Sequence, residues 1–349
     1  MDCGINIEKG GFELPCLVSF VIPHKGRFEL LKETLLSILN QDFDLQKIEI
    51  IIVTQEPRLD FTDMDKRGGE LKIIYCSPQE TIAALRNKGA AIAQGECFAF
   101  IDADIRLSSN WLKMILEELQ AKDNRVLVSA AVTSQTGASP VEKIWAQLEH
   151  RNIDCTVDSL HARNLFLLKE IFRQAKGFPE QLKTCEDIYF TNKLSKRGEV
   201  YVTSRTTYEH LGEDKTYRDL FTKEIWRSQS NFKSLRKRKI HLQEWPSILL
   251  PIWELISFLL FLSIFCIILP PSFVMLSGAK HLAIDSSAFG LRMTILLGGI
   301  VLFFLPIMIY TLQLYLSNKN DLRLVDIFWF YTIYCTARTI GSFKGLLKL

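Results

Sequence analysis

Several features are scarce in this chain of 349 residues, and each absence excludes a class of protein. The eight cysteines lie scattered, without CxxC pairs or Cys/His spacing, so neither a zinc site nor a disulfide framework is indicated. No GxGxxG or GxxxxGK[ST] loop follows the first apolar run, which argues against dinucleotide-binding and P-loop sites. Positive charge is not in excess, since 42 Lys and Arg oppose 39 Asp and Glu, and we expect no nucleic-acid partner.

Charge is scarce in the last hundred residues, where 247–349 hold 7 Lys and Arg and 4 Asp and Glu. The runs at about 248–270 and 293–315 contain one charge, Glu254, and none, respectively. Each run reaches the ~20 apolar residues that a membrane-spanning helix needs. A third segment, 325–343, has a shorter apolar centre and is expected either to span the membrane or to lie in its interface. The sequence therefore predicts a helical membrane region over 247–349.

The segment 233–246 marks the border of this region, because it carries a cluster of Lys and Arg that the positive-inside rule places in the cytosol. The first fifteen residues contain charges and no long apolar run, so no secretory leader is expected. We therefore expect an integral membrane protein whose first domain, 1–232, faces the cytoplasm. Glu254 is interpreted either as an intramembrane site or as a side chain that reaches the headgroups.

Apolar runs alternate with helical spacing through the first hundred residues. We expect strands at 17–23, 48–53, 71–75 and 97–101, and helices at 28–40 and about 80–94. This alternation predicts an α/β fold with a mostly parallel sheet and helices on both faces. In such sheets, ligands bind beyond the carboxyl ends of the strands.

Acidic residues lie where such a site is expected. Asp102 and Asp104 follow the fourth strand directly, and two carboxylates this close are costly to bury unless a cation lies beside them. Mg²⁺ or Mn²⁺ takes such oxygen ligands and commonly bridges to substrate phosphates. Glu186 and Asp187 open a predicted helix, where they act either as helix caps or, for one of them, as a general base. His210 is interpreted either as a third metal ligand or as a surface histidine.

The order of these motifs resembles glycosyltransferase family 2, whose members have the GT-A fold. The residues that carry the likeness are VIP, SILNQ, EIIIV, ALRNKGAAIAQGECFAFIDADI and GFPEQLKTCEDIYFTNKLSKRG, within about 17–235. The resemblance implies a membrane-anchored, Rossmann-like, inverting enzyme that uses Mg²⁺ or Mn²⁺ and a nucleotide-diphosphate sugar. It also implies roles for individual residues. The expected metal ligands are Asp102, Asp104 and His210; the catalytic pair is Asp187, the base, with Glu186; the donor-binding residues are Pro23, Arg27, Glu56, Arg86, Asn87 and Ala103.

Two departures from the family pattern limit these expectations. The loop after the second strand, 53–57, lacks the family's acidic, glycine- and serine-bearing sequence, which contacts the nucleoside. The identity of the nucleotide base therefore does not follow from the sequence, and Glu56 is only a candidate substitute for the acidic residue of that loop. The QxxRW motif of processive synthases is also absent, and the corresponding region reads WRSQS at 226–230. We therefore expect the transfer of single sugars.

The expected acceptor is membrane-associated: a polyprenyl phosphate, a lipid-linked glycan or a glycolipid, with membrane lipids as further partners. The charge run 236–239 either steers an anionic lipid headgroup to the site or marks topology alone. A catalytically degenerate scaffold of a glycan-assembly system is the main alternative. A haloacid-dehalogenase-like phosphatase is a weaker one, because it needs Thr or Val where this chain has Arg106.

Overall fold

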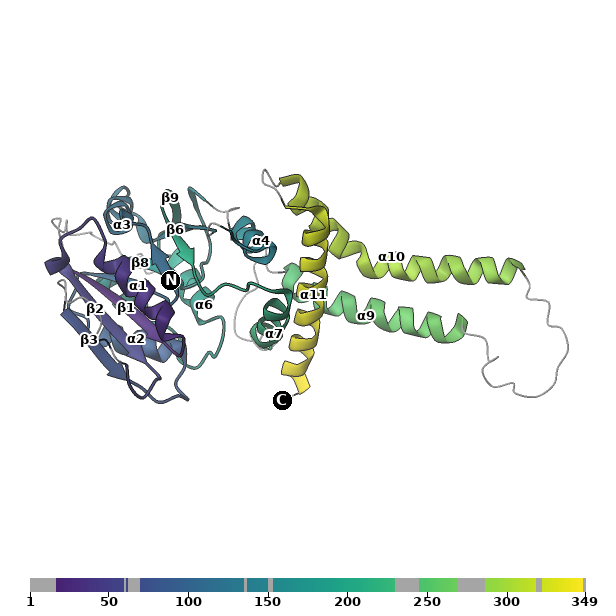
Figure 1. Ribbon diagram of the computed structural model, residues 1–349, viewed down its shortest axis with the longest axis horizontal. Coiled ribbons are helices and arrows are strands. Elements are labelled where there is room, and N and C mark those ends of the chain that lie inside the picture. Colours follow the sequence, from purple (N-terminus) through teal and green to yellow (C-terminus); the bar gives the residue numbers. More distant parts are fainter. Residues whose placement is uncertain are drawn as a thin grey trace, which may run out of the picture. The chain divides into compact units, whose positions relative to one another are not determined.

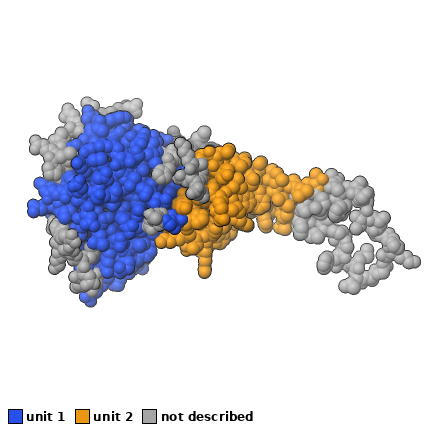
Figure 2. Space-filling view, turned by 45° about the horizontal axis from the view of Figure 1, so that its top comes forward, with its two compact units in different colours: residues 1–138, 145–213 blue, residues 139–144, 214–349 orange. Residues whose placement is uncertain are grey.

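The structure is a computed structural model that describes residues 17–59, 61, 70–134, 137–149, 153–229, 245–268, 286–317 and 322–347 (Figure 1). The chain divides into two compact units, residues 1–138 with 145–213 and residues 139–144 with 214–349 (Figure 2). Unit 1 holds the β-sheet, and unit 2 holds the long apolar helices. Most of the predicted basic segment 233–246 lies outside the described residues, as do the first sixteen residues.

Within the described residues, unit 1 contains a nine-stranded sheet in the order β3-β2-β1-β4-β8-β6-β9-β5, with β7 pairing to β9. The strands are β1 (Val18–His24), β2 (Ile48–Thr54), β3 (Glu70–Tyr75), β4 (Cys97–Ile101), β5 (Ile105–Leu107), β6 (Arg125–Thr133), β7 (Cys155–Thr156), β8 (Asn164–Leu168) and β9 (Glu199–His210). The helices are α1 (Phe28–Leu39), α2 (Ile82–Ile92), α3 (Trp111–Gln120), α5 (Lys169–Gln174) and α6 (Glu186–Ser195), with a 3-10 turn at Leu45–Lys47. Helix α4 (Pro140–Glu149) is divided, and its residues up to 144 belong to unit 2.

The predicted α/β architecture is confirmed. Strands β3, β2, β1 and β4 pair in parallel, as their alternation with helices predicted. The second half of the sheet is mixed, because β8 runs antiparallel to β4 and β6 while β6 and β9 are parallel. The short strands β5 and β7 both pair antiparallel to β9. The long strand β9 therefore pairs with three strands from different parts of the chain, β5, β6 and β7.

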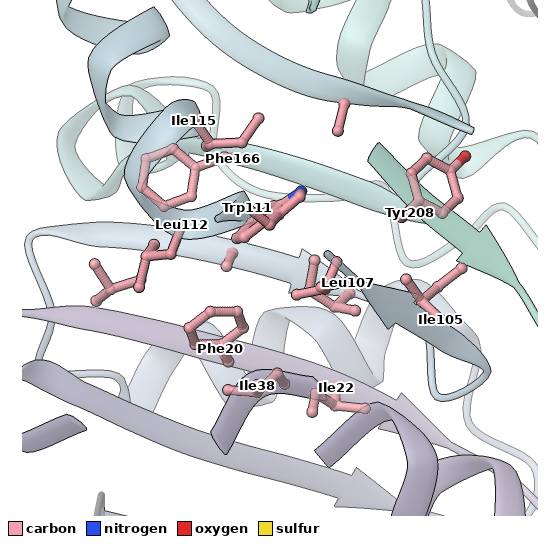
Figure 3. Close-up of a cluster of buried hydrophobic side chains, with 14 of the residues drawn as sticks. Phe20, Ile22, Ile38, Ile105, Leu107, Trp111, Leu112, Ile115, Phe166 and Tyr208 are labelled. Atoms are coloured by element: carbon pink, nitrogen blue, oxygen red, sulfur yellow. The ribbon is translucent and has the colours of Figure 1, made fainter. Parts of the chain in front are cut away.

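The core has two apolar layers, one on each face of the sheet. Successive side chains of a strand point to opposite faces, so Phe20 and Ile22 join one layer and Val21 the other. Helices α1 and α3 cover the first face, where Trp111 packs against Phe20 and Phe166 (Figure 3). Helices α2, α5 and α6 cover the second face, which is rich in phenylalanine. These layers fix the strand ends that carry the polar residues.

The strand order identifies the edge at which a ligand is expected. Strand β1 lies between β2 and β4, so the chain leaves β1 toward one side and returns to its other side. Such a reversal of direction leaves a crevice beyond the carboxyl ends of the two strands. The loop after β1, residues 25–27, and the loop after β4, residues 102–104, meet there.

Unit 2 consists of helices α7 (Tyr217–Ser228), α9 (Trp245–Ile268), α10 (Ser286–Ser317) and α11 (Leu324–Leu347). Helices α9 and α10 run side by side, and α11 crosses them and packs against α7 (Figure 1). Among the described residues, one stretch, Leu297–Ser317 of α10, is long and apolar enough to cross a membrane by length and composition. Only 17% of its most apolar window is buried among the described residues.

The three predicted membrane segments fall on helices of unit 2: 248–268 on α9, 293–315 on α10 and 325–343 on α11, while the last two residues of the first segment lie outside the described residues. Helix α9 contributes a shorter apolar stretch, Leu249–Ser263. Glu254 is buried in this stretch and accepts a hydrogen bond from Thr339 of α11 at 2.7 Å. The structure thus gives Glu254 a partner on a neighbouring helix, which the sequence did not indicate.

Candidate active site

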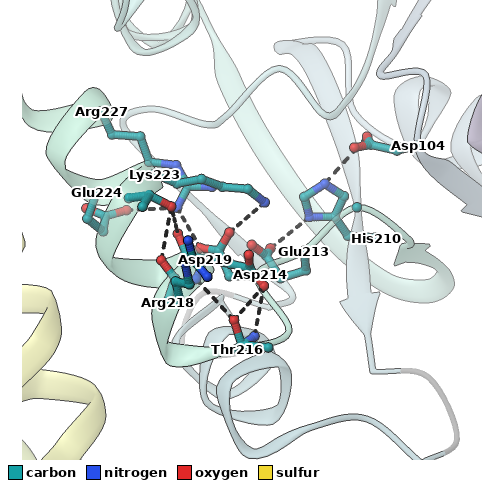
Figure 4. Close-up of polar contacts among 12 residues, drawn as sticks. Asp104, His210, Glu213, Asp214, Thr216, Arg218, Asp219, Lys223, Glu224 and Arg227 are labelled. Carbon is teal, nitrogen blue, oxygen red and sulfur yellow. Dashed lines mark hydrogen bonds and ion pairs between the residues drawn. The ribbon is translucent and has the colours of Figure 1, made fainter. Parts of the chain in front are cut away.

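The loop after β4 is locked to the end of β9. Strand β5 pairs with β9 so that Ile105 lies opposite His210, and the Leu211 N–H donates to the Asp104 carbonyl at 2.8 Å. This register brings the His210 ring to the Asp104 carboxylate, with 3.5 Å between Nε2 and Oδ1. The other ring nitrogen, Nδ1, lies 2.7 Å from Glu213 Oε2 (Figure 4). His210 is therefore held between two carboxylates.

The loop after β1 reaches the same carboxylate. Arg27 Nη2 forms an ion pair with Asp104 Oδ2 at 2.7 Å, and the Arg27 backbone is left-handed, with φ 44°. A non-glycine residue in that conformation is strained, which is common at ligand sites. Glu56, after β2, accepts a hydrogen bond from the Gly26 N–H at 2.8 Å. A Cβ added to Gly212 would overlap the Asp104 carboxylate, so a larger residue there would displace this side chain.

Arg86 links the two acidic motifs across the interior. Its Nη2 lies 2.8 Å from Asp102 Oδ1 and its Nη1 lies 2.9 Å from Glu186 Oε1. Burial and the adjacent Asp187 charge raise the pKa of Glu186 to about 7, against the opposing pull of Arg86. Burial also raises the pKa of Asp102, although Arg86 acts in the opposite direction. Arg86 is thus the counter-ion that lets two carboxylates remain in the interior.

Asp187 lies in the first turn of α6, as predicted, and both of its oxygens are engaged. Oδ1 accepts from the Ile188 N–H at 2.7 Å, and Oδ2 accepts from the Ala162 N–H at 3.2 Å. Oδ2 also lies 3.3 Å from Nδ1 of His161. Burial would raise the pKa of Asp187, but His161 and Arg86 outweigh it and lower the pKa to about 2.

Cys185 caps the N-terminus of α6 with a left-handed backbone, φ 63°. The chain therefore turns sharply just before Glu186 and Asp187. Because the amide dipoles of a helix favour negative charge at its N-terminus, this turn sets the two carboxylates where the helix stabilises them.

The remaining predicted donor-binding residues occupy structural positions near these loops. Asn87 donates to the Phe178 carbonyl at 2.9 Å and to the Glu180 carboxylate at 2.8 Å, and it accepts from the Phe178 N–H. It therefore ties α2 to the turn that precedes α6. Pro23 lies inside β1, paired with Val53 of β2. Ala103 packs against the first core layer.

The structure shows which of the three expected metal ligands come together. Asp104 and His210 face each other, whereas the Asp102 carboxylate is paired with Arg86. No group of three or more His, Cys, Asp or Glu residues forms a ready metal cage in the part of the chain that the structure describes. The Asp104 carboxylate and the His210 imidazole nevertheless suit Mn²⁺ or Mg²⁺, which commonly bind through one or two carboxylates and complete their shell with substrate phosphates. Asp104 and His210 therefore fit a divalent cation that takes its remaining ligands from outside the protein.

The acidic side chains at this edge of the sheet are paired with basic side chains of the protein. Burial would raise the pKa of Asp104, but its bonds to His210 and Arg27 lower it. Burial and Arg163 would lower the pKa of His210, but Asp104 and Glu213 outweigh them and raise it to about 9.

Three polar residues at the site were missed by sequence reasoning. His161 contacts Asp187, Glu213 contacts His210, and Arg163 pairs with both Glu213, at 3.4 Å, and Glu149. None of them lies in a recognisable motif. Glu213 is three residues after His210, and His161 and Arg163 directly precede the apolar run of β8, so only the topology of the sheet shows their place.

Comparison with known proteins agrees with this arrangement. Residues 19–176 match the family model described as glycosyl transferase family 2. These residues belong to glycosyl transferase family 2. The matched part begins in β1 and contains Arg86 of α2 and the loops with Arg27, Asp102 and Asp104.

The curated relatives share parts of this chain. Polypeptide N-acetylgalactosaminyltransferase 5 of Caenorhabditis elegans is 26% identical over 138 residues, 36% of this chain and 21% of that protein. Glycosyltransferase AglE of Haloferax volcanii is 21% identical over 194 residues, 52% of this chain and 62% of that protein. The chain thus spans less than two thirds of the length of either relative.

A solved structure extends the comparison to almost the whole chain. The mannosyltransferase PcManGT from Pyrobaculum calidifontis, in complex with GDP-Man and Mn²⁺, matches with a TM-score of 0.56 and 16% identity. The match covers 95% of this chain and 88% of that one. At this identity the likeness concerns the fold, and it confirms the predicted GT-A architecture.

Proposed function

We propose that this protein transfers a single sugar from a nucleotide-diphosphate sugar to a membrane-associated acceptor, with inversion at the anomeric carbon. The observation that carries the proposal is the Asp104–His210 pair at the end of β4, beside the reversal of strand order and within a family 2 domain. That PcManGT was solved with GDP-Man and Mn²⁺ supports a donor of the same general class.

Each motif has a task in this proposal. Asp102, Asp104 and His210 would hold Mg²⁺ or Mn²⁺. A bound cation would neutralise the charge that develops on the departing diphosphate. Arg27 lies beside Asp104, with more than half of its side chain exposed, and can turn to a diphosphate oxygen. Asp187 activates the acceptor, which then displaces the diphosphate in one step.

The pairing of Arg86 separates the roles of the two acidic residues in α6. Glu186 is occupied by Arg86, whereas Asp187 is bonded to backbone N–H groups and to an exposed histidine. We therefore assign Glu186 to holding the site together and Asp187 to the acceptor. Glu56, Asn87, Pro23 and Ala103 would shape the donor pocket.

The apolar helices support a membrane-associated acceptor. We propose that α10, together with α9, anchors the chain in a bilayer and that the first domain faces the cytoplasm. An anchored enzyme meets acceptors that lie in the membrane, such as a polyprenyl phosphate, a lipid-linked glycan or a glycolipid. The glucosyl-dolichyl phosphate glucuronosyltransferase of Haloferax volcanii, 24% identical over 107 residues, acts by its name on such a lipid-linked sugar.

A transfer assay tests the proposal. The full chain in detergent is incubated with UDP-, GDP-, dTDP- and CDP-activated sugars, Mn²⁺ and a membrane lipid extract, and nucleoside diphosphate release and glycolipid products are measured. We expect turnover with one donor class, its loss with EDTA, and a product of inverted anomeric configuration. Asp104→Asn should abolish turnover, whereas Asp123→Asn, a substitution at an exposed turn, should not.

The same assay tests the alternatives. If no donor is turned over and no nucleotide binds, the chain is better described as a scaffold. Turnover that persists in EDTA would contradict the metal-dependent mechanism, and retention of configuration would contradict the single displacement.

A further inference from the structure

We infer that His161 is the group that takes the proton from the acceptor, and that Asp187 holds and polarises its imidazole ring. This inference rests on the proposed function and refines the role of Asp187 in it. No motif identifies His161, which precedes β8 by three residues and reaches Asp187 only through the fold.

Asp187 and His161 differ in how far their side chains are exposed to an incoming acceptor. The Asp187 side chain is 17% exposed, and three N–H groups surround its oxygens: those of Ile188, Ala162 and the His161 ring. The His161 side chain is 64% exposed. An incoming hydroxyl therefore meets the imidazole more readily than the carboxylate.

The hydrogen bond also sets the tautomer of His161. A carboxylate accepts and does not donate, so Asp187 Oδ2 selects the proton on Nδ1, 3.3 Å away. The neutral ring then has its lone pair on Nε2, free to accept a proton. The same division of labour, in which a carboxylate orients a histidine that carries the proton, operates in the catalytic triads of hydrolases.

The charges around His161 agree with this role. Asp187 of α6, Glu149 at the end of α4 and Arg163 beside β8 are the charged groups that act on it. The protein atoms around the ring and Arg163 lower the pKa of His161, but the two carboxylates outweigh them and the pKa rises above its usual value. Asp187, with a pKa of about 2, is a weak base by comparison. A base works best when its pKa lies near the pH at which it acts.

The proton-transfer step balances without an added reactant. As the acceptor oxygen bonds to the anomeric carbon, its proton passes to Nε2 of His161. The bond from the anomeric carbon to the diphosphate oxygen breaks, and its electron pair leaves with the diphosphate. The imidazolium then returns its proton to water, and Asp187 remains ionised throughout.

Hydrolysis of the nucleotide sugar by the full chain in detergent, with water as acceptor, tests the inference without knowledge of the natural acceptor. We expect His161→Ala to lower kcat by about 10²–10⁴-fold, the usual contribution of a general base. The dissociation constant of the nucleotide sugar should stay unchanged. The rise of the wild-type rate with pH, as His161 loses its proton, should be absent in the variant.

Chemical rescue distinguishes proton transfer from a structural role. Because His161 is exposed, its removal leaves an opening to solvent, and added imidazole should restore turnover to His161→Ala, with rates that follow the pKa of substituted imidazoles. Asp187→Asn, which keeps the histidine, is the control and should not be rescued. If His161→Ala has the kcat and the pH profile of the wild type, the inference is wrong and the proposed function still stands. Absence of turnover in the wild type itself overturns the proposed function and this inference with it.

Discussion

Replacement of Arg86 is the sharpest test of how the interior of unit 1 is held together. Arg86→Leu puts an apolar side chain in the position of the arginine and leaves Asp102 and Glu186 without their counter-ion. Breaking a buried ion pair by removing one partner costs about 3–5 kcal/mol, because an uncompensated charge stays in the interior. Glu186, with a pKa of about 7, can take up a proton instead, so the cost should be smallest at acidic pH.

The chain offers a matched control for this substitution. Arg106 also pairs with two carboxylates, Glu33 and Glu209, each at 2.9 Å, but its side chain is 45% exposed, whereas that of Arg86 is 3% exposed. Exposed pairs contribute about 0–1 kcal/mol, so Arg106→Leu should be nearly neutral.

Thermal unfolding of the full chain in detergent, followed by tryptophan fluorescence, compares the two variants. A change of 1 kcal/mol moves the melting temperature of a domain of this size by about 2–4 °C, so we expect Arg86→Leu to unfold roughly 10 °C below the wild type. Arg106→Leu should unfold within about 4 °C of it. Adding Glu186→Gln to Arg86→Leu should recover part of the loss. Equal melting temperatures for Arg86→Leu and Arg106→Leu would refute the reasoning that burial makes the Arg86 pairs strong.

Two further predictions concern pH and helix packing. Glu186 has a folded pKa above its unfolded value, so the native state binds the extra proton and stability falls as pH rises from about 4.5 to 7. We therefore expect the stability of Glu186→Gln relative to the wild type, measured by urea unfolding, to be greater at pH 8 than at pH 5 by about 1–3 kcal/mol. A difference that does not change with pH would contradict this. Gly341→Ala places a Cβ on the Ser228 side chain and the Ile225 carbonyl, where α11 meets α7. We expect it to cost about 1–3 kcal/mol in thermal unfolding, whereas Gly298→Ala in α10, with no heavy atom within 4 Å, should unfold at or above the wild-type temperature.

The parts of the fold that follow local patterns are predictable from the sequence. Strands β1 to β4 and helices α1, α2 and α6 lie where apolar runs and helical spacing place them, within a few residues. Asp102 and Asp104 end a buried strand, and the position of such residues beyond the sheet follows from topology alone.

Pairings between distant residues are not predictable in this way. The Arg86 to Glu186 bond joins residues one hundred positions apart, and it decides which of the two acidic residues of α6 remains available. The antiparallel course of β5 beside β9 brings His210 to Asp104, and no periodicity in either segment indicates that register. His161 becomes part of the site only because β8 enters the sheet between β4 and β6.

Nucleotide binding is the most direct measurement of the central claim, that the end of β4 is the donor site. Isothermal titration of the full chain with UDP, GDP, dTDP and CDP, with and without Mn²⁺, needs no acceptor. The account predicts binding of one nucleoside diphosphate that strengthens at least tenfold with Mn²⁺, equivalent to about 1.4 kcal/mol, and that Asp104→Asn removes the Mn²⁺ effect. Binding that is equally strong without Mn²⁺ and in Asp104→Asn, or no binding of any of the four nucleotides, would contradict it.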